Sequence, residues 1–370
     1  MNQARHRRVI ISGGGTGGHI FPAISIANAL KAVDRGTEIL FVGALGRMEM
    51  ERVPAAGYKI VGLPVAGLKR TRIWQNLAVI AKLIRSLFMA RSVIKEFNPD
   101  VVVGVGGYAS GPVLWIAGRM GIPLLIQEQN SFAGVTNKLL AGRASKICVA
   151  YNGMERYFPA SKIMITGNPV RSSYNNLESL RAEALASLGI EGDGTVVLVL
   201  GGSLGAGTVN RTVEVSANAL RNRDITWIWQ SGKNYYEKVA AAVAAEGLTN
   251  VKVFSFIDRM DLAYAAADII VSRAGAGTIS ELCLVGKPVI LVPSPNVAED
   301  HQTRNALALV ENDAAQLLRD NEVATMLPHE VEKLAGDLAR RKTLSENIVK
   351  MALPDSDRII ADEIMKLANR

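Results

Sequence analysis

A glycine-rich stretch that ends in a histidine is the part of the sequence best suited to chemistry. It runs Gly13-Gly-Gly-Thr-Gly-Gly-His19 and follows a short apolar run, residues 9–11. Glycines let a backbone turn sharply and bring its N–H groups close to an anion, and the dipole of a following helix favours negative charge there. The pattern predicts a strand, a phosphate-holding loop and a helix, with the imidazole of His19 placed as a base or an anion contact.

Two nucleotide-binding motifs and a ligand-free turn compete for this stretch. The glycine spacing fits a dinucleotide loop, but the next apolar run, residues 39–42, ends in Gly43 and Ala44 rather than in the acid that NAD binding requires. No Gly-Lys-Ser/Thr follows the glycines, which excludes a P-loop. For the glycines alone, a tight strand-to-helix turn without a ligand is an equal alternative. The presence of His19 favours a ligand-binding loop over such a turn.

Length and composition indicate a folded protein with more than one domain. The chain has 370 residues, 49% of them hydrophobic, which is enough for two or three cores. Cys148 and Cys283 lie far apart without metal-ligand spacing, so we expect reduced thiols and a cytosolic protein. The apolar run after Arg8 is too short for a signal peptide, and the longest uncharged stretch, residues 101–118, is broken by glycines and a proline. No membrane span is predicted.

The two halves of the sequence repeat one pattern. Residues 99–126 and 267–292 each contain an apolar run, a glycine-rich turn, a helical segment and a second apolar run, and the opening at residue 9 has a counterpart at residue 195. Continuous apolar strands that alternate with helices are typical of parallel sheets. The sequence therefore predicts an α/β protein of two Rossmann-like domains facing each other across a cleft, with a boundary in the turn-forming residues 167–171.

The second half supplies two further candidate anion loops. Gly202-Ser-Leu-Gly205 and Gly275-Ala-Gly-Thr278 each lie between a predicted strand and a helix, where N–H groups and a hydroxyl can hold a diphosphate. Thr278-Ile-Ser-Glu281 also fits a capping box, which needs no ligand. The pattern leaves these two explanations equally open.

Familiar metal and nucleophile motifs are missing from the sequence. It has no His-Glu-x-x-His, no Gly-x-Ser-x-Gly and no cysteine cluster, and Asp355 and Asp357 precede a helical pattern as a cap with a first-turn acid would. We therefore predict no catalytic metal. Helix N-termini and Arg171 would stabilise the charge of a leaving diphosphate instead.

The net charge of +8 is concentrated in one segment. Between Arg52 and Lys95 there are nine Lys or Arg residues and no Asp or Glu. Trp74 begins a helical stripe there, and Lys82 and Arg85 lie off its apolar face, which consists of Ile73, Leu77, Ile80, Ile84, Leu87 and Phe88. A core-packing helix with a solvated basic face and a surface helix facing anionic lipid both fit, the first better on the pattern alone. Nucleic acid ranks low, because stacking aromatics are not interleaved with the basic residues.

Six motifs in a fixed order resemble the MurG family of peptidoglycan glycosyltransferases. They are Gly13-Gly-Gly-Thr-Gly-Gly-His19, Gly106-Gly-Tyr-Ala-Ser-Gly-Pro112, Glu128-Gln-Asn130, Gly167-Asn-Pro-Val-Arg171, Gly201-Gly-Ser203 and Asp300-His-Gln-Thr-Arg-Asn305. The resemblance implies a glycosyltransferase B-type fold. Residues 1–167 would form an acceptor and membrane-associating domain, residues 168–349 a UDP-N-acetylglucosamine donor domain, and residues 350–370 a helix that returns to the first domain.

The resemblance also implies roles for individual residues. Glu281 would bind the ribose hydroxyls, and the backbone of Ile257 would contact the nucleotide. The acceptor and sugar contacts implied are Thr16, Gly17, Gly18, Tyr108, Asn130, Gln302 and Asn305. The remaining nucleotide contacts implied are Arg171, Ser203, Ala276, Gly277, Thr278, Ile279 and Ser280.

The reaction that the resemblance implies is an inverting transfer without a cofactor. The C4 hydroxyl of undecaprenyl-diphospho-N-acetylmuramyl pentapeptide (lipid I) would attack UDP-N-acetylglucosamine and give lipid II. His19 is the first choice for the general base and Glu128 the second. The expected partners are the two substrates, an anionic membrane surface and other cell-wall synthesis proteins, with the chain peripheral on the cytoplasmic face of the inner membrane.

Three alternatives remain beside this reaction. A UDP-N-acetylglucosamine epimerase on the same fold would need no lipid acceptor. Another B-type glycosyltransferase would use a different lipid acceptor. A non-catalytic nucleotide-binding or dehydrogenase-like module would not need His19.

Overall fold

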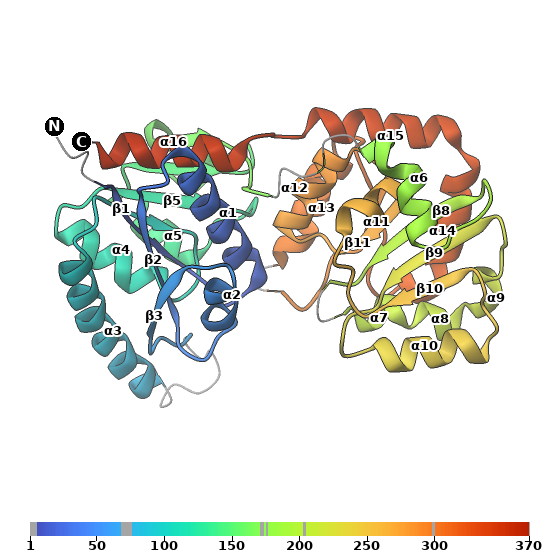
Figure 1. The fold of residues 1–370 in the computed structure, drawn as a ribbon, viewed down its shortest axis with the longest axis horizontal. Coiled ribbons are helices and arrows are strands. Elements are labelled where there is room, and N and C mark those ends of the chain that lie inside the picture. The colour runs from blue at the N-terminus through green and yellow to red at the C-terminus, as the bar shows by residue number, and fades with distance from the viewer. Residues whose placement is uncertain are drawn as a thin grey trace. The chain divides into compact units, whose positions relative to one another are not determined.

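The computed structural model describes residues 6–67, 76–170, 174, 177–202, 205–297 and 300–369. The chain divides into two compact units (Figure 1). Unit 1 is Met1–Val170 with Leu353–Arg370, and unit 2 is Arg171–Ala352. Each unit is built on one parallel sheet, so the α/β class with two parallel-sheet domains is confirmed.

Unit 1 contains a seven-stranded sheet in the order β3-β2-β1-β4-β5-β6-β7. Neighbouring strands are parallel, and most of them are buried along their length, as the unbroken apolar runs predict. The strands are β1 (Arg8–Ser12), β2 (Glu38–Ala44), β3 (Lys59–Leu63), β4 (Val101–Gly104), β5 (Leu124–Glu128), β6 (Lys146–Val149) and β7 (Ile163–Ile165).

Helices cover both faces of this sheet. Strand β1 shows why, because Val9 and Ile11 pack in one core while Ile10 packs in the other. The first core lies against α1 (Gly17–Val33) and α16 (Ser356–Ala368), which pack against each other and are the blue and red helices of this unit in Figure 1. The second core lies against α3 (Asn76–Phe97), α4 (Ser110–Arg119) and α5 (Val135–Leu140), while α2 (Glu49–Ala55) packs beside β2 and β3.

Unit 2 contains a six-stranded parallel sheet in the order β10-β9-β8-β11-β12-β13. Its strands are β8 (Thr195–Leu200), β9 (Ile225–Gln230), β10 (Val251–Phe254), β11 (Ile269–Ser272), β12 (Val289–Leu291) and β13 (Gln316–Leu317). One face packs on α6 (Leu177–Ser187), α11 (Met260–Ala266), α12 (Ala276–Val285), α13 (His301–Val310) and α15 (Leu338–Lys350). The other face packs on α7 (Gly207–Asn210), α8 (Thr212–Val215), α9 (Ala217–Leu220), α10 (Tyr236–Ala245) and α14 (Val323–Gly336).

The basic apolar segment forms α3, but its apolar stripe is not a core face. Ile80, Ile84 and Phe88 are exposed, whereas the buried side of the helix carries Ala90 and Ile94. The core-packing alternative is therefore wrong for the first half of α3. Ile73 and Trp74 lie outside the described residues, and the side chain of Leu77 is not described either. No helix among the described residues is long and apolar enough to cross a membrane.

Candidate functional site

Three loops of unit 1 meet at the carboxyl edge of its sheet. The chain leaves β1 toward β2 and β3 on one side, then returns to β4 and β5 on the other side, so β1 and β4 flank a topological switch point. Open parallel sheets bind ligands at such points. The loops there are residues 13–16 after β1, residues 105–109 after β4 and residues 129–134 after β5.

The first three backbone N–H groups of the glycine loop donate hydrogen bonds to other parts of unit 1. Gly13 donates to the Val42 carbonyl (3.3 Å), Gly14 donates to the Gly106 carbonyl (3.3 Å), and Gly15 donates to Glu49 Oε2 (3.0 Å). The side chain of the N-cap residue Thr16 makes no capping hydrogen bond at the start of α1. The N–H groups left to face a ligand are those from Thr16 to Gly18, so the phosphate-holding part that we predict for this loop is its second half.

Glu49 was not identified from the sequence. It begins α2, its side chain is 1% exposed, and its two carboxylate oxygens accept from Ala44 N (2.9 Å) and Gly15 N (3.0 Å). A Cβ on Gly14 or on Gly43 would overlap this side chain. An acid therefore does lie near the end of β2, but it comes from helix α2, and it binds the backbone of the glycine loop instead of facing a ligand.

His19 lies on the first turn of α1, between the loops after β1 and β4. Its Nδ1 is 3.2 Å from the Gly14 carbonyl oxygen and 3.2 Å from Thr16 Oγ1. On its other side a Cβ on Gly106 would be 2.9 Å from Nε2, so only glycine leaves room for the ring. The structure therefore holds the imidazole of His19 at the switch point.

Glu128, the second choice for the base, has both carboxylate oxygens engaged. Oε1 accepts from the backbone N–H of Asn130 (3.1 Å) and from its side-chain amide (3.4 Å). Oε2 accepts from Gly134 N (2.9 Å) and from Asn137 Nδ2 (2.9 Å). Because the carboxylate is 2% exposed and saturated with donors, we assign it the role of shaping the loop that carries Asn130.

Buried amides join the loops after β4 and β5 to the end of unit 1. Asn168 Oδ1 accepts from Gln127 Nε2 (3.0 Å), and Asn168 Nδ2 donates to the Gln129 carbonyl (3.0 Å). Gln129 Nε2 in turn donates to the Val105 carbonyl (2.8 Å). Tyr108, in contrast, is exposed at the same edge, where its side chain is available to a ligand.

Helix α12 presents the anion-binding end of unit 2. It follows β11, which with β8 flanks the switch point of this sheet, and it begins at Ala276 with Gly275 as an extended N-cap residue. The capping-box explanation is wrong, because the N-cap residue is Gly275 and Thr278 is the third residue of the helix. Arg171 and Ser203 lie outside the described residues.

The stretch from Ala276 to Glu281 does not act as one surface. Ile279 packs in the core and its N–H donates to the Gly275 carbonyl (2.9 Å), while Ser280 Oγ donates to the Ala276 carbonyl (3.1 Å). A helix turns successive side chains to different faces, so a continuous sequence motif cannot be a continuous contact surface. The nucleotide contacts implied for Ile279 and Ser280 stay predictions, and the side chain of Ile279 belongs to the core.

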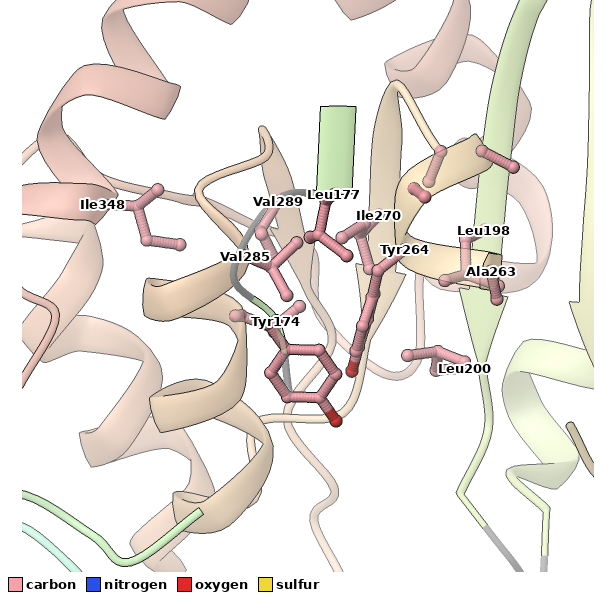
Figure 2. Close-up of a cluster of buried hydrophobic side chains, with 14 of the residues drawn as sticks. Tyr174, Leu177, Leu198, Leu200, Ala263, Tyr264, Ile270, Val285, Val289 and Ile348 are labelled. Atoms are coloured by element: carbon pink, nitrogen blue, oxygen red, sulfur yellow. The ribbon is translucent and has the colours of Figure 1, made fainter. Parts of the chain in front are cut away.

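Glu281 lies above a buried pair of tyrosines. The Tyr264 hydroxyl is 3.5 Å from Glu281 Oε2, and the ring of Tyr264 packs edge-on against that of Tyr174 with centroids 5.2 Å apart. Figure 2 shows the two rings next to each other in the core of unit 2. Burial, followed by the charge of Glu281, raises the pKa of Tyr264 well above its usual value, so its hydroxyl stays a donor. Tyr264 was not identified from the sequence, where it reads as one more apolar residue.

The remaining predicted contacts of unit 2 differ in their access to a ligand. Gln302 Oε1 accepts from Ser294 N (2.8 Å), which leaves its amide nitrogen for a sugar hydroxyl. Asn305 is fully buried and donates to the Ala274 carbonyl (3.4 Å), so it supports the loop after β11, and its contact with the sugar stays a prediction. The N–H of Ile257 donates to Gln230 Oε1 (3.0 Å), so contact with a base would fall to its carbonyl.

An arginine at the end of β11 was also missed. Arg273 donates to the carbonyls of Val292 (3.1 Å) and Pro293 (3.2 Å), forms an ion pair with Asp320, and donates to Thr208 Oγ1 (2.9 Å). It thereby fixes the loops after β11 and β12 to the start of α7. Among the described residues, no group of three His, Cys, Asp or Glu side chains could hold a metal ion.

Comparisons with known proteins match both units. Residues 9–149 match the glycosyltransferase family 28 N-terminal domain, and residues 196–358 match the glycosyltransferase family 28 C-terminal domain. A UDP-N-acetylglucosamine--N-acetylmuramyl-(pentapeptide) pyrophosphoryl-undecaprenol N-acetylglucosamine transferase from Bacteroides thetaiotaomicron is 58% identical over 363 residues, which is 98% of each chain. The protein of the same name from Parabacteroides distasonis is 56% identical over 99% of this chain and 100% of its own.

Solved structures agree with these matches. The crystal structure of Acinetobacter baumannii MurG has a TM-score of 0.77 at 30% identity and covers 97% of this chain and 99% of its own. A UDP-N-acetylglucosamine 2-epimerase has a TM-score of 0.66 at 14% identity, with 99% and 98% coverage, and this likeness shows the fold alone. The chain belongs to glycosyltransferase family 28.

Proposed function

We propose that this chain transfers N-acetylglucosamine from UDP-N-acetylglucosamine to undecaprenyl-diphospho-N-acetylmuramyl pentapeptide, which converts lipid I to lipid II. The observation that carries the proposal is identity to the named transferases along nearly the whole chain. The positions of His19 and Glu281 at the switch points of the two sheets support it. The likeness to the epimerase adds nothing to that alternative, because it shows the fold alone.

The chemistry that we propose is a single inverting displacement. The C4 hydroxyl of the muramyl residue attacks the anomeric carbon, the bond to the UDP oxygen breaks, and UDP leaves with the bonding electron pair. His19 accepts the hydroxyl proton, a contribution worth ~10²–10⁴ in rate for a well-placed base. The N-terminus of α12, which follows the extended Gly275, stabilises the charge that develops on the diphosphate.

Each substrate has its own unit in this proposal. The acceptor binds unit 1 at the N–H groups from Thr16 to Gly18, with Tyr108 and Asn130 beside the sugar. UDP-N-acetylglucosamine binds unit 2, where Glu281 accepts from the ribose hydroxyls and Gln302 donates to the sugar. No cofactor takes part.

The exposed half of α3 is the surface that we propose for docking to an anionic membrane. It carries Ile80, Leu83, Ile84 and Phe88, all exposed, on a segment without an acidic residue. Lys82 and Arg85, on the same turns, are exposed as well. Large apolar side chains beside cations fit the boundary between acyl chains and anionic headgroups. The chain would lie on the cytoplasmic face of the inner membrane, where it meets its lipid-linked acceptor.

The test is transfer of radiolabelled N-acetylglucosamine to a short-chain analogue of the lipid-linked muramyl pentapeptide, in EDTA. We expect labelled disaccharide-lipid from the wild type and a loss of about 100-fold or more in His19→Ala. The matched control is His329→Ala, which removes an exposed histidine of α14 in unit 2 and should keep full activity. Turnover of the donor without transfer would refute the transferase and favour the epimerase.

A further inference from the structure

One peptide group connects the buried carboxylate of Glu49 to the imidazole of His19. Gly15 N–H donates to Glu49 Oε2 (3.0 Å), and the Gly14 carbonyl oxygen is 3.2 Å from His19 Nδ1. The N–H of Gly15 and the carbonyl of Gly14 belong to the same peptide bond. A carboxylate, a peptide group and an imidazole therefore follow one another along one line of hydrogen bonds.

The geometry points to Glu49 as a positioning residue for the transfer reaction, acting on His19 through the peptide group between Gly14 and Gly15. Nδ1 has two neighbours at 3.2 Å, the Thr16 hydroxyl and the Gly14 carbonyl, and a bond donated by the hydroxyl would belong to the tautomer with its proton on Nε2. A carbonyl oxygen can only accept, so a hydrogen bond between neutral His19 and Gly14 places the proton on Nδ1. The lone pair is then on Nε2, the nitrogen that faces Gly106 and the switch point. The inference rests on the proposed role of His19 as the base.

The carboxylate also strengthens the bond that selects this tautomer. A negative charge that accepts from the N–H of a peptide group polarises that group and makes its carbonyl oxygen a better acceptor. Glu49 is buried, and a second bond from Ala44 N (2.9 Å) fixes its orientation. Its charge therefore acts on the peptide group with little screening by water.

The backbone around this peptide group is built to hold it in place. Gly14 and Gly15 have φ values of +143° and +92°, which residues with a side chain rarely adopt. A Cβ on Gly14 would overlap the Glu49 carboxylate, and a Cβ on Gly107 would overlap the Gly14 carbonyl from the other side. Glycine is required on both sides because the carboxylate and the loop after β4 enclose the peptide group.

The first test measures the tautomer of His19 in the wild type by ¹⁵N NMR of histidine-labelled protein. The chain has only four histidines, so the signals of His19 can be assigned as those that vanish in His19→Gln. At a pH where the ring is neutral, we expect a protonated Nδ1 and an unprotonated Nε2. A proton on Nε2 would overturn the inference, and this result requires no variant to fold.

The second test compares Glu49→Gln with Asp34→Asn. Glutamine keeps the size of Glu49 but has one acceptor for two N–H groups, so the tautomer preference should be lost and kcat should fall about 100-fold. KM for UDP-N-acetylglucosamine, which we place on unit 2, should stay within about twofold. Asp34→Asn also removes a carboxylate that accepts a backbone N–H in unit 1, that of Gly36 (2.9 Å), and should change neither readout.

Two outcomes of the second test would refute the relay. The first is an unchanged kcat in Glu49→Gln, and the second is a reduced kcat with the wild-type tautomer retained, since Glu49 would then act only by supporting the loop. The spectra are recorded without substrate. Full activity of His19→Ala, which would refute His19 as the base, is therefore distinguishable from a failure of the relay.

Discussion

Replacing Phe88 by serine should weaken binding to anionic vesicles without weakening the fold. Phe88 is the most exposed large apolar residue of the proposed docking surface on α3, at 72%. Full burial of such a side chain is worth about 1.5–3 kcal/mol, so the exposed fraction offers about 1–2 kcal/mol to a membrane. At about 1.4 kcal/mol for each factor of ten, Phe88→Ser should raise the dissociation constant about 5- to 30-fold.

Leu338 provides a matched control for this prediction. It is 71% exposed, nearly the same as Phe88, but it lies on α15 of unit 2. Co-sedimentation with vesicles that contain phosphatidylglycerol would measure both Phe88→Ser and Leu338→Ser, with the melting temperature of each variant as a check on folding. If the two variants lose binding equally, or if neither does, α3 is not the docking surface.

Docking of α3 to a membrane would have an apolar and an electrostatic contribution, and the dependence of binding on salt separates the two. Lys82 and Arg85 are exposed near Phe88, and each cation close to an anionic surface contributes about 1 kcal/mol, an attraction that salt screens. Binding of Phe88→Ser should therefore depend on salt as strongly as that of the wild type. A variant with both cations replaced by glutamine should depend on salt less. An unchanged salt dependence in that variant would refute the electrostatic part of the proposal.

Three further predictions follow from buried groups. Tyr264→Phe keeps the ring but removes the hydroxyl that donates a hydrogen bond to Glu281. KM for UDP-N-acetylglucosamine should therefore rise about fivefold, while KM for the lipid-linked substrate stays unchanged. An unaltered KM for UDP-N-acetylglucosamine in steady-state kinetics would contradict this. Asn168→Ala leaves buried amides without partners and should lower the free energy of unfolding by about 1–3 kcal/mol in urea titrations, and a smaller loss would show that the amide network matters little. Burial raises the pKa of the Cys148 and Cys283 thiols to about 12, so neither should react with a disulfide reagent at pH 8 until the protein unfolds. Because the unfolded thiols ionise first, stability should fall as pH rises from about 9 toward 12, and rapid labelling of the folded protein would refute their burial.

The repeated strands were predictable because their signal is local. Unbroken apolar runs followed by glycine turns recur in both halves, and each becomes a strand at the centre of a parallel sheet. The glycine loop and His19 were found for the same reason. Periodicity alone could not decide which way α3 faces, because an apolar stripe looks the same whether it meets a core or a membrane.

The supporting residues of the site could not be predicted because their contacts are distant or ordinary in sequence. Glu49 lies 34 residues from the loop that it holds, and no local pattern distinguishes it from a surface acid. The sequence between Thr278 and Glu281 fits a capping box if the helix begins after Thr278. In the structure the helix begins earlier, after the extended Gly275. Asn305 belongs to a family motif, but only its burial shows that it supports a loop.

The packing of α16 on α1 has a consequence for how the protein folds during synthesis. Helix α1, which carries His19, ends at Val33, whereas its partner begins at Ser356. The ribosome therefore completes unit 2 while Ile20, Ile26 and Leu30 still lack the residues Ile360, Ile364 and Leu367 that share their core. Domains generally fold as units, so unit 2 can fold first even though unit 1 is begun first. A nascent chain stalled before α16 would have an exposed apolar face on the helix that carries the proposed base, which suits chaperone binding and delays activity until the last helix docks.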